Sequence, residues 1–447
     1  MSGIAGIANP ERKELVAQML KKMNHRGQAW SEVLGNNKAV LGINGFSNQK
    51  KAQSNFRKNG LAKDGCVPGR FAQAQITENG FVLKRDPLGA APLYYGWTPK
   101  KELCFASEVK ALILATRDIH ELPPGTILEG GKEKPYFTLE AQQISTTDPA
   151  MIATSLRHKL EESVERSIGD GNVGSWLSGG LDSSIMAALA IKRVPKLHTF
   201  AAGLPGAPDL KFARQMASYI KSEHHEVIVS LDEILSVLPD VIYSLESFDA
   251  LLVRSSILNF LVARQAARFT PAVFSGEGGD ELFAGYEYLK SLPPQSLSAE
   301  LVDILKRLHN TALQRVDRCA SANGTLPHVG FLDPEVVKYA LGIPADYKLH
   351  DGVEKWILRE SVTDLLPQAI LHRTKAKFWE GGGVENVLAE YAEKHISDAD
   401  FAKERHITGN WRLNTKEEVY YFRLFKQFFG ESKDLGWMGR TKGSPVS

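Results

Sequence analysis

Residues 178–184 read Ser-Gly-Gly-Leu-Asp-Ser-Ser, and this stretch decides the fold. The apolar run 173–177 before it predicts a buried strand, and residues 185–193 after it are rich in good helix formers. Glycines let backbone N–H groups approach an anion closely, and a helix N-terminus adds partial positive charge at the same place. The stretch therefore predicts a phosphate-binding turn between a strand and a helix of an α/β domain.

An acid distinguishes this turn from the Walker loop, in which Gly-Lys-Ser/Thr follows at a fixed spacing. Here the charged residue is Asp182. A carboxylate beside a phosphate site has a chemical purpose when it holds Mg2+ that bridges phosphate oxygens. An ordinary glycine-rich turn is the alternative interpretation. The acid, the two serines after it and the clusters described below favour a magnesium–nucleotide site.

The stretch 178–184 resembles the pyrophosphate loop of the ATP pyrophosphatases, which cleave ATP to AMP and pyrophosphate while they adenylate a substrate. Within that group the chain is similar to the glutamine-hydrolysing asparagine synthetases and the β-lactam synthetases, most strongly from about residue 170 to 430. The resemblance implies ATP and Mg2+ as cofactors. It also implies a doubly wound parallel sheet of the adenine nucleotide alpha hydrolase type, behind an N-terminal-nucleophile β-sandwich domain.

Length and composition indicate the number of domains, the kinds of partner and the cellular compartment of this protein. The 447 residues leave room for two or three domains, and 54 basic against 52 acidic residues give no sign of a nucleic-acid surface. Three cysteines without metal spacing fit a reducing compartment. Neither a signal peptide nor an apolar run of membrane-spanning length is present, so we expect a cytoplasmic protein. Its expected partners are a small, amino-acid-like substrate and a second copy of the chain in a homodimer, with neither nucleic acid nor membrane.

The first part of the chain resembles the glutaminase domain of asparagine synthetases. The matching segments are S-G-I-A-G-I at 2–7, H-R-G at 25–27, R-D-P-L-G at 85–89, P-L-Y-Y at 92–95 and A-S-E-V-K-A-L at 106–112. The family places its nucleophilic cysteine where this chain has Ser2, and residues 44–71 hold no counterpart of the family's glutamine-binding segments. A serine hydroxyl is a far poorer nucleophile than a thiol. We therefore expect a degenerate domain and no nitrogen from glutamine.

Beyond the phosphate turn, strands and helices alternate as in a doubly wound parallel sheet. In such sheets ligands lie at the carboxyl ends of the strands, so the turns at 178–184, 202–206 and 275–281 are expected to converge on one nucleotide. We expect a glutaminase-like domain over residues 1–145, a synthetase domain over 146–430 and a flexible tail over 431–447.

Two further clusters supply charge. Residues 275–281, Ser-Gly-Glu-Gly-Gly-Asp-Glu, match a family loop assigned to adenylate and pyrophosphate–Mg2+ contacts, so Asp280 is expected to hold the metal together with Asp182. Residues 373–383 resemble the family segment R-x-K-x-x-F-x-x-G, which makes Lys375 the catalytic lysine by position, with Lys377 the competing candidate. Its ammonium would neutralise charge that develops on the phosphate.

The segment that should bind the substrate departs from the family pattern. Residues 248–256 match Y-D-V-T-T-I-R-A-S and keep Arg254, which could pair with a carboxylate. Leu251 and Leu252 replace the two threonines, and further on Leu326 and His328 replace an acid and an arginine. A pocket without these polar groups suits an acid that is larger or less charged than aspartate. Neutral drift outside the pocket is the alternative reading of these changes.

The sequence thus predicts an ATP-dependent ligase that adenylates a carboxylate and then forms an amide. An intramolecular lactam of the tabtoxinine-β-lactam type is the favoured product, and an amide formed from ammonia or a small amine, as in an asparagine synthetase-like enzyme, is the alternative. A nucleotide-binding pseudoenzyme is the alternative from another class. The expected nucleotide-binding residues are Leu177, Ser178, Gly179, Gly180, Asp182, Ser183, Ala202, Ser275 and Gly276. Asp182 and Asp280 are expected to bind the metal. The residues expected to bind the substrate are Asp249, Leu252, Arg254, Glu277 and Gly278. Lys375 and Glu277 are expected to act in catalysis.

Overall fold

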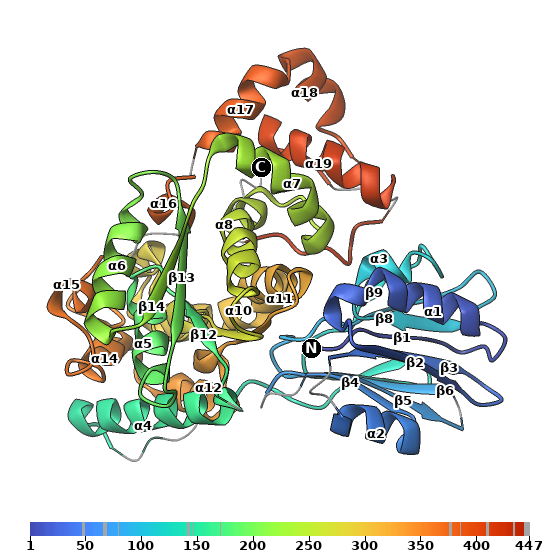
Figure 1. Ribbon diagram of the computed structural model, residues 1–447, viewed down its shortest axis with the longest axis horizontal. Coiled ribbons are helices and arrows are strands. Elements are labelled where there is room, and N and C mark those ends of the chain that lie inside the picture. The colour runs from blue at the N-terminus through green and yellow to red at the C-terminus, as the bar shows by residue number, and fades with distance from the viewer. Residues whose placement is uncertain are drawn as a thin grey trace.

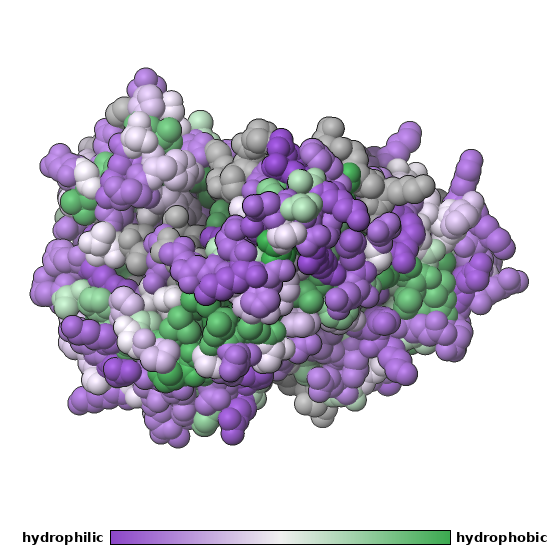
Figure 2. Space-filling model, turned by 90° about the horizontal axis from the view of Figure 1, so that it is seen from above, coloured by the Kyte–Doolittle hydropathy of each residue, from purple (hydrophilic) through white to green (hydrophobic). Residues whose placement is uncertain are grey.

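The computed structural model divides into an N-terminal β-sandwich, drawn in blue, and a larger α/β part, drawn from green to red (Figure 1). The residues that it describes are 1–46, 50–65, 69–78, 80–140, 144, 146–169, 171–374, 378–384, 386–407, 411–431 and 434–441. Within these ranges no helix has the length and apolar character needed to cross a membrane. Hydrophilic side chains cover most of the face in Figure 2, because most large apolar residues are enclosed in the cores.

The N-terminal domain packs two antiparallel sheets face to face, with strand orders β2-β3-β1-β8-β7-β9 and β11-β10-β6-β5-β4. The strands are β1 (Ile4–Ile7), β2 (Trp30–Gly35), β3 (Val40–Gly45), β4 (Leu61–Asp64), β5 (Ala72–Thr77), β6 (Gly80–Arg85), β7 (Tyr94–Trp97), β8 (Leu103–Ala106), β9 (His120–Glu121), β10 (Thr126–Glu129) and β11 (Lys132–Pro135). The helices are α1 (Lys13–Lys22), α2 (Lys50–Asn59) and α3 (Val109–Leu112). Leu41, Leu83 and Phe105 pack between the sheets. The expected sandwich is confirmed.

The second part is built on a parallel sheet with the strand order β14-β13-β12-β15-β16. These strands are β12 (Gly174–Trp176), β13 (His198–Gly203), β14 (Glu223–Ile228), β15 (Ala272–Phe274) and β16 (Leu326–His328). The expected doubly wound parallel sheet is confirmed, and helices cover both of its faces (Figure 1). Strand β16 was not expected: its three residues, Leu-Pro-His, carry a proline, which an edge strand tolerates.

Helices make up most of the remaining second part. They are α4 (Pro149–Ile168), α5 (Leu181–Ala190), α6 (Pro208–Ile220), α7 (Leu231–Leu245), α8 (Ala250–Ala266), α9 (Gly279–Leu282), α10 (Pro294–Arg307), α11 (Ala312–Ala322), α12 (Pro334–Gly342), α13 (Ala345–Lys348), α14 (Trp356–Glu360), α15 (Gln368–Leu371), α16 (Phe378–Gly381), α17 (Val387–His395), α18 (Asp398–Glu404) and α19 (Lys416–Phe429). Helix α8 is buried along most of its length, because the sheet covers one side and α7 and α11 cover another.

A buried ionic network joins the two parts. Arg26 of the sandwich contacts Asp64 at 2.8 Å, Glu108 at 2.9 Å and Asp317 of α11 at 2.8 Å. Burial opposes ionisation of Asp317, but the positive charges of Arg26 and Arg70 lower its pKa. Loss of one partner from such a network leaves an uncompensated buried charge, which typically destabilises a protein by about 3–5 kcal/mol. The network therefore fixes α11 against the N-terminal domain.

The expectation of a flexible tail over 431–447 is wrong for the residues 434–441. Leu435, Trp437 and Met438 are at most 5% exposed and belong to the core. The Trp437 ring lies 6.3 Å from that of Tyr94 in the sandwich, edge to face. The lysines, glycines and serines of this segment indicated a flexible tail, although it also contains these three apolar residues. Their burial against both parts of the molecule outweighs the entropic cost of ordering the chain.

Replacing Trp437 with alanine tests this anchor. Because truncation of a buried tryptophan removes apolar burial and leaves a cavity, we expect W437A to lower the free energy of unfolding by about 3–5 kcal/mol in denaturant titrations. The control is Y219A, which truncates a side chain that is 52% exposed on α6. Equal, small effects of both substitutions would mean that the tail is not part of the core.

Candidate functional site

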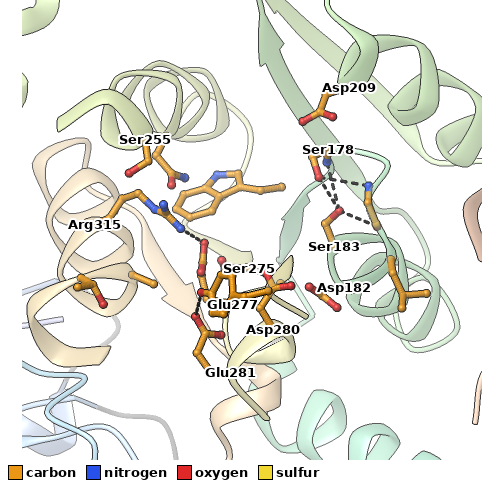
Figure 3. A pocket seen from close by; sticks show the side chains of 18 of the residues that line it. Ser178, Asp182, Ser183, Asp209, Ser255, Ser275, Glu277, Asp280, Glu281 and Arg315 are labelled. Atoms are coloured by element: carbon orange, nitrogen blue, oxygen red, sulfur yellow. Dashed lines mark hydrogen bonds and ion pairs between the residues drawn. The ribbon is translucent and has the colours of Figure 1, made fainter. Parts of the chain in front are cut away.

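A cavity of about 440 Å3 opens at the carboxyl ends of β12, β13 and β15 (Figure 3). Many of the residues predicted from the sequence line it: Leu177, Ser178, Gly180, Asp182, Ser183, Ala202, Leu252, Ser275, Gly276, Glu277 and Asp280. The turns after three separate strands therefore converge on one space. Sequence reasoning could find this convergence because parallel strands end at the same edge of their sheet.

The phosphate turn is held in shape by its own side chains and by α6. The Ser178 and Ser183 hydroxyls lie 3.1 Å apart, and the Gly180 N–H donates to the Ser178 hydroxyl at 3.3 Å. Gly179 has a φ of +72°, and a Cβ there would lie 2.5 Å from the backbone nitrogen of Ala213. Only glycine fits, so the chain passes close to α6 and α5 begins with its N-terminus at the cavity.

The acidic loop after β15 packs directly on the phosphate turn through its glycines. A Cβ on Gly276 would lie 2.6 Å from the Ser183 nitrogen, and one on Gly279 would overlap the carboxyl of Asp182. Because no side chain separates the loops, Asp182 and Asp280 come close together, as Figure 3 shows.

Lys355 joins these two acids, and sequence reasoning missed it. Its Nζ lies 2.5 Å from Asp182 Oδ2 and 2.6 Å from Asp280 Oδ1, and the residue is 2% exposed. The backbone at Lys355 has a φ of +57°, which is uncommon for a residue with a side chain. A Cβ on Gly285 would overlap the lysine side chain, so this glycine makes the necessary room. No local motif marks the residue, because its partners are far away in the sequence.

The same acid pair has the chemistry of a magnesium site. The carboxylates of Asp182 and Asp280 converge on one cationic group, the Lys355 ammonium. Carboxylate oxygens are the ligands that Mg2+ takes from proteins, usually one or two at a time beside substrate phosphates. The two acids therefore fit the ion that the sequence predicts.

Another acid of the same loop, Glu281, is buried beside this pair. Burial, reinforced by the charges of Asp280 and Glu277, raises the pKa of Glu281 to about 7. Its carboxyl accepts hydrogen bonds from the Tyr286 hydroxyl at 2.5 Å and the Gly278 N–H at 3.1 Å. Such a carboxyl can exchange a proton during a reaction at physiological pH.

Glu277 faces the cavity but is paired with a base that was not predicted. Its carboxylate contacts the guanidinium of Arg315 on α11, as Figure 3 shows. Burial opposes the charge of Arg315, but the carboxylate of Glu277 beside it raises the pKa of Arg315 above its usual value. The pair places one positive and one negative charge at the end of the cavity beside α11.

The substitutions noted in the substrate segment divide into two sets. Leu251 and Leu252 line the cavity, so the wall that the resemblance expects to carry threonine hydroxyls is apolar. Leu326 and His328 instead belong to strand β16 and are not among the lining residues. Burial lowers the pKa of His328 to about 3, so that this imidazole is neutral. Of these four substituted residues, only Leu251 and Leu252 line the cavity.

Several predicted site residues have other surroundings. Arg254 does not line the cavity. Its guanidinium instead pairs with Glu417, and the distances from Arg254 Nε to the two carboxylate oxygens are 2.7 and 3.0 Å. Asp249 caps α8 by accepting from the Leu252 N–H at 2.9 Å and also accepts from the Thr441 N–H. Gly278 is likewise absent from the lining.

None of Asp249, Arg254 and Gly278 lines the cavity, so their expected contacts with a substrate stay predictions, and Gly179 acts on the shape of its turn without lining the cavity. Lys375 and Lys377 lie outside the described residues.

The chain is a two-domain α/β protein, in which a parallel sheet is joined to an antiparallel sandwich. Its cavity combines a glycine-rich turn before a helix with a pair of acids. The family profile described as asparagine synthase matches residues 155–303 and 292–441, and that of a glutamine amidotransferase domain matches residues 63–114. The asparagine synthetase [glutamine-hydrolyzing] 2 of Arabidopsis thaliana is 34% identical over 394 residues, which are 81% of this chain and 67% of that protein. The chain belongs to the asparagine synthase family.

Asparagine synthetase B [glutamine-hydrolyzing] of Escherichia coli (strain K12) is 35% identical over 388 residues, which are 80% of this chain and 69% of that protein. The chain thus spans about two thirds of the length of these curated relatives. Among solved structures, the NMN synthetase from Francisella tularensis is 12% identical, with a TM-score of 0.29, over 65% of this chain and 98% of that one.

Replacing Lys355 with methionine tests its function between the acids. The change leaves two buried carboxylates without their ammonium, so we expect K355M to lower the free energy of unfolding by about 3–5 kcal/mol without divalent ions. Mg2+ should then raise the melting temperature of K355M more than that of the parent protein. The matched control is K416M, because Lys416 also pairs with two acids, Glu393 at 2.9 Å and Asp398 at 2.7 Å, but these are exposed. A K355M protein as stable as K416M would contradict the assignment.

Proposed function

We propose that this protein is an ATP-dependent amide-forming ligase that adenylates a carboxylate, releases pyrophosphate and then lets an amine displace AMP. The observation that carries the proposal is the contact between the phosphate turn and the acidic loop, which brings Asp182 and Asp280 together at one cavity. Family membership supports the same conclusion, since the relatives are named asparagine synthetases.

The phosphates would lie on the turn around Gly180, where backbone N–H groups and the N-terminus of α5 favour negative charge. Asp182 and Asp280 would hold Mg2+, which supplies positive charge to the phosphates when bound. Until the ion binds, Lys355 keeps the two carboxylates close together and reduces the repulsion between them. Water exclusion by the surrounding apolar wall would strengthen each of these electrostatic contacts.

Lys375 is proposed as the group that neutralises charge developing on the phosphate. Two observations support its proximity to the site. Arg373 and Thr374, just before it in the chain, line the cavity, and an Arg373 N–H donates to the carbonyl oxygen of Ser178 at 3.1 Å. Residues 373 and 374, which precede Lys375 in the chain, therefore lie at the cavity.

We further propose that the nitrogen does not come from glutamine. Ser2 stands where the family resemblance places a cysteine, and it is fully buried. Its backbone N–H donates to Asp64, a member of the ionic network between the two parts of the molecule. These contacts support a structural function for the N-terminal domain.

The amine is proposed to belong to the substrate itself, so that the product is a lactam. Leu251 and Leu252 support this choice, because an apolar wall favours a longer acid over aspartate. The second candidate is an amide formed from ammonia or a small amine. The Arg315–Glu277 pair favours it, because the pair could receive a charged amino-acid group. The relatives are named asparagine synthetases, which supports an asparagine-like product, although their names give glutamine as the nitrogen source.

Turnover assays with ATP, Mg2+ and a series of amino acids test this proposal. We expect AMP and pyrophosphate in equal amounts, and no glutamate when glutamine is supplied. Loss of a charge-stabilising group typically lowers kcat by about 100- to 1,000-fold, which we expect for K375A, while K377A serves as the control. Formation of ADP, or full activity of K375A, would contradict adenylation with Lys375. Absence of turnover with every acid would favour a nucleotide-binding pseudoenzyme.

A further inference from the structure

Three side chains of the kinds that can bind a metal ion meet at the amino ends of β13 and β14. The cavity, in contrast, lies at the carboxyl ends of the parallel strands. His198 is the first residue of β13, Glu223 is the first of β14 and His225 follows two positions later. One ligand atom from each of the three lies within 4.8 Å of those of the other two. No step of the proposed reaction uses them.

The sheet register creates this cluster. Parallel pairing sets His198 beside Glu223 and Phe200 beside His225. Because side chains alternate between the faces of a strand, Glu223 and His225 point to the same side of β14. The resulting distance from His198 Nδ1 to His225 Nε2 is 3.0 Å, and that to Glu223 Oε2 is 3.6 Å.

Aromatic packing holds the two imidazoles in place. The ring of Phe269 lies 4.0 Å from that of His225 and 5.3 Å from that of His198. Phe200 stacks on His225 at 5.1 Å. Ligand rings that are already positioned lose little freedom when an ion binds, so the cost of assembling the site is low.

We propose that His198, Glu223 and His225 form a binding site for a transition-metal ion of the Zn2+ type. Two imidazole nitrogens and one carboxylate are a donor set that Zn2+ accepts, with the fourth position left to water or another ligand. Zn–N bonds of 2.0–2.1 Å place two tetrahedral ligands about 3.3 Å apart, close to the 3.0 Å between the histidine nitrogens. These nitrogens share a hydrogen bond, which the ion would replace when both present a lone pair to it. Mg2+ prefers oxygen ligands and does not suit two imidazoles.

Lys196 competes with an ion at this site. Its Nζ lies 2.6 Å from Glu223 Oε1, and its side chain is 54% exposed. An exposed ion pair contributes little to stability, so the ammonium can move into solvent when a divalent ion takes the carboxylate. A bound ion would cross-link β14, the edge strand of the sheet, to β13, whose other end carries Ala202 into the cavity.

Zinc titration of the full-length protein after EDTA treatment tests the site. We expect one Zn2+ per chain by calorimetry and elemental analysis, a higher melting temperature with Zn2+, and a tetrahedral visible spectrum with Co2+. Removal of a group that only hydrogen-bonds to a ligand typically weakens metal binding about 10- to 100-fold, so loss of a ligand itself in H198A or H225A should weaken it by at least about 100-fold.

Three more variants distinguish coordination by these side chains from zinc binding elsewhere on the surface. H224A is the matched control, because His224 lies on the same strand but bonds to Thr199, and its zinc affinity should equal that of the parent. E223Q should weaken binding without loss of the fold, since Glu223 is about half exposed. K196A should strengthen binding by removing the competing cation. Equal zinc affinity in H198A, H225A, E223Q and the parent, or absence of zinc binding by the parent, would overturn the proposal.

Discussion

The ammonium of Lys355 between the carboxylates of Asp182 and Asp280 is the contact on which the candidate site depends. Two glycine-rich loops bring both acids to one side of the cavity, where their mutual repulsion in a largely buried place would push the loops apart. One lysine from a distant part of the chain offsets that repulsion. The arrangement holds the acids close enough to share one cation, which is what a magnesium–nucleotide complex requires.

The N-terminal domain helps to hold in place the helices that line this site. Arg26 fixes α11 through Asp317, and α11 presents Arg315 to the cavity. The segment 434–441 adds a second connection, because Trp437 packs against the sandwich and Thr441 bonds to Asp249 at the start of α8. The N-terminal domain therefore supports the helices that line the cavity.

The sequence predicted what local chemistry determines. The strand–glycine–helix turn at 178–184 and the acidic loop at 275–281 carry their signals within a few residues, and the rule for parallel sheets brings them together. Lys355, Arg315 and the partner of Arg254 could not be predicted, because each depends on a contact between segments that are distant in the sequence. The tail was misjudged because three apolar residues in a polar segment give no periodicity.

A crystal structure with Mg2+ and a non-hydrolysable ATP analogue would test the central claim most directly. The account predicts a magnesium ion bound by Asp182 and Asp280, with the Lys355 ammonium moved from between them onto a phosphate oxygen. A nucleotide bound elsewhere, or one bound in the cavity while Lys355 still bridges the two acids and no ion lies beside them, would contradict it.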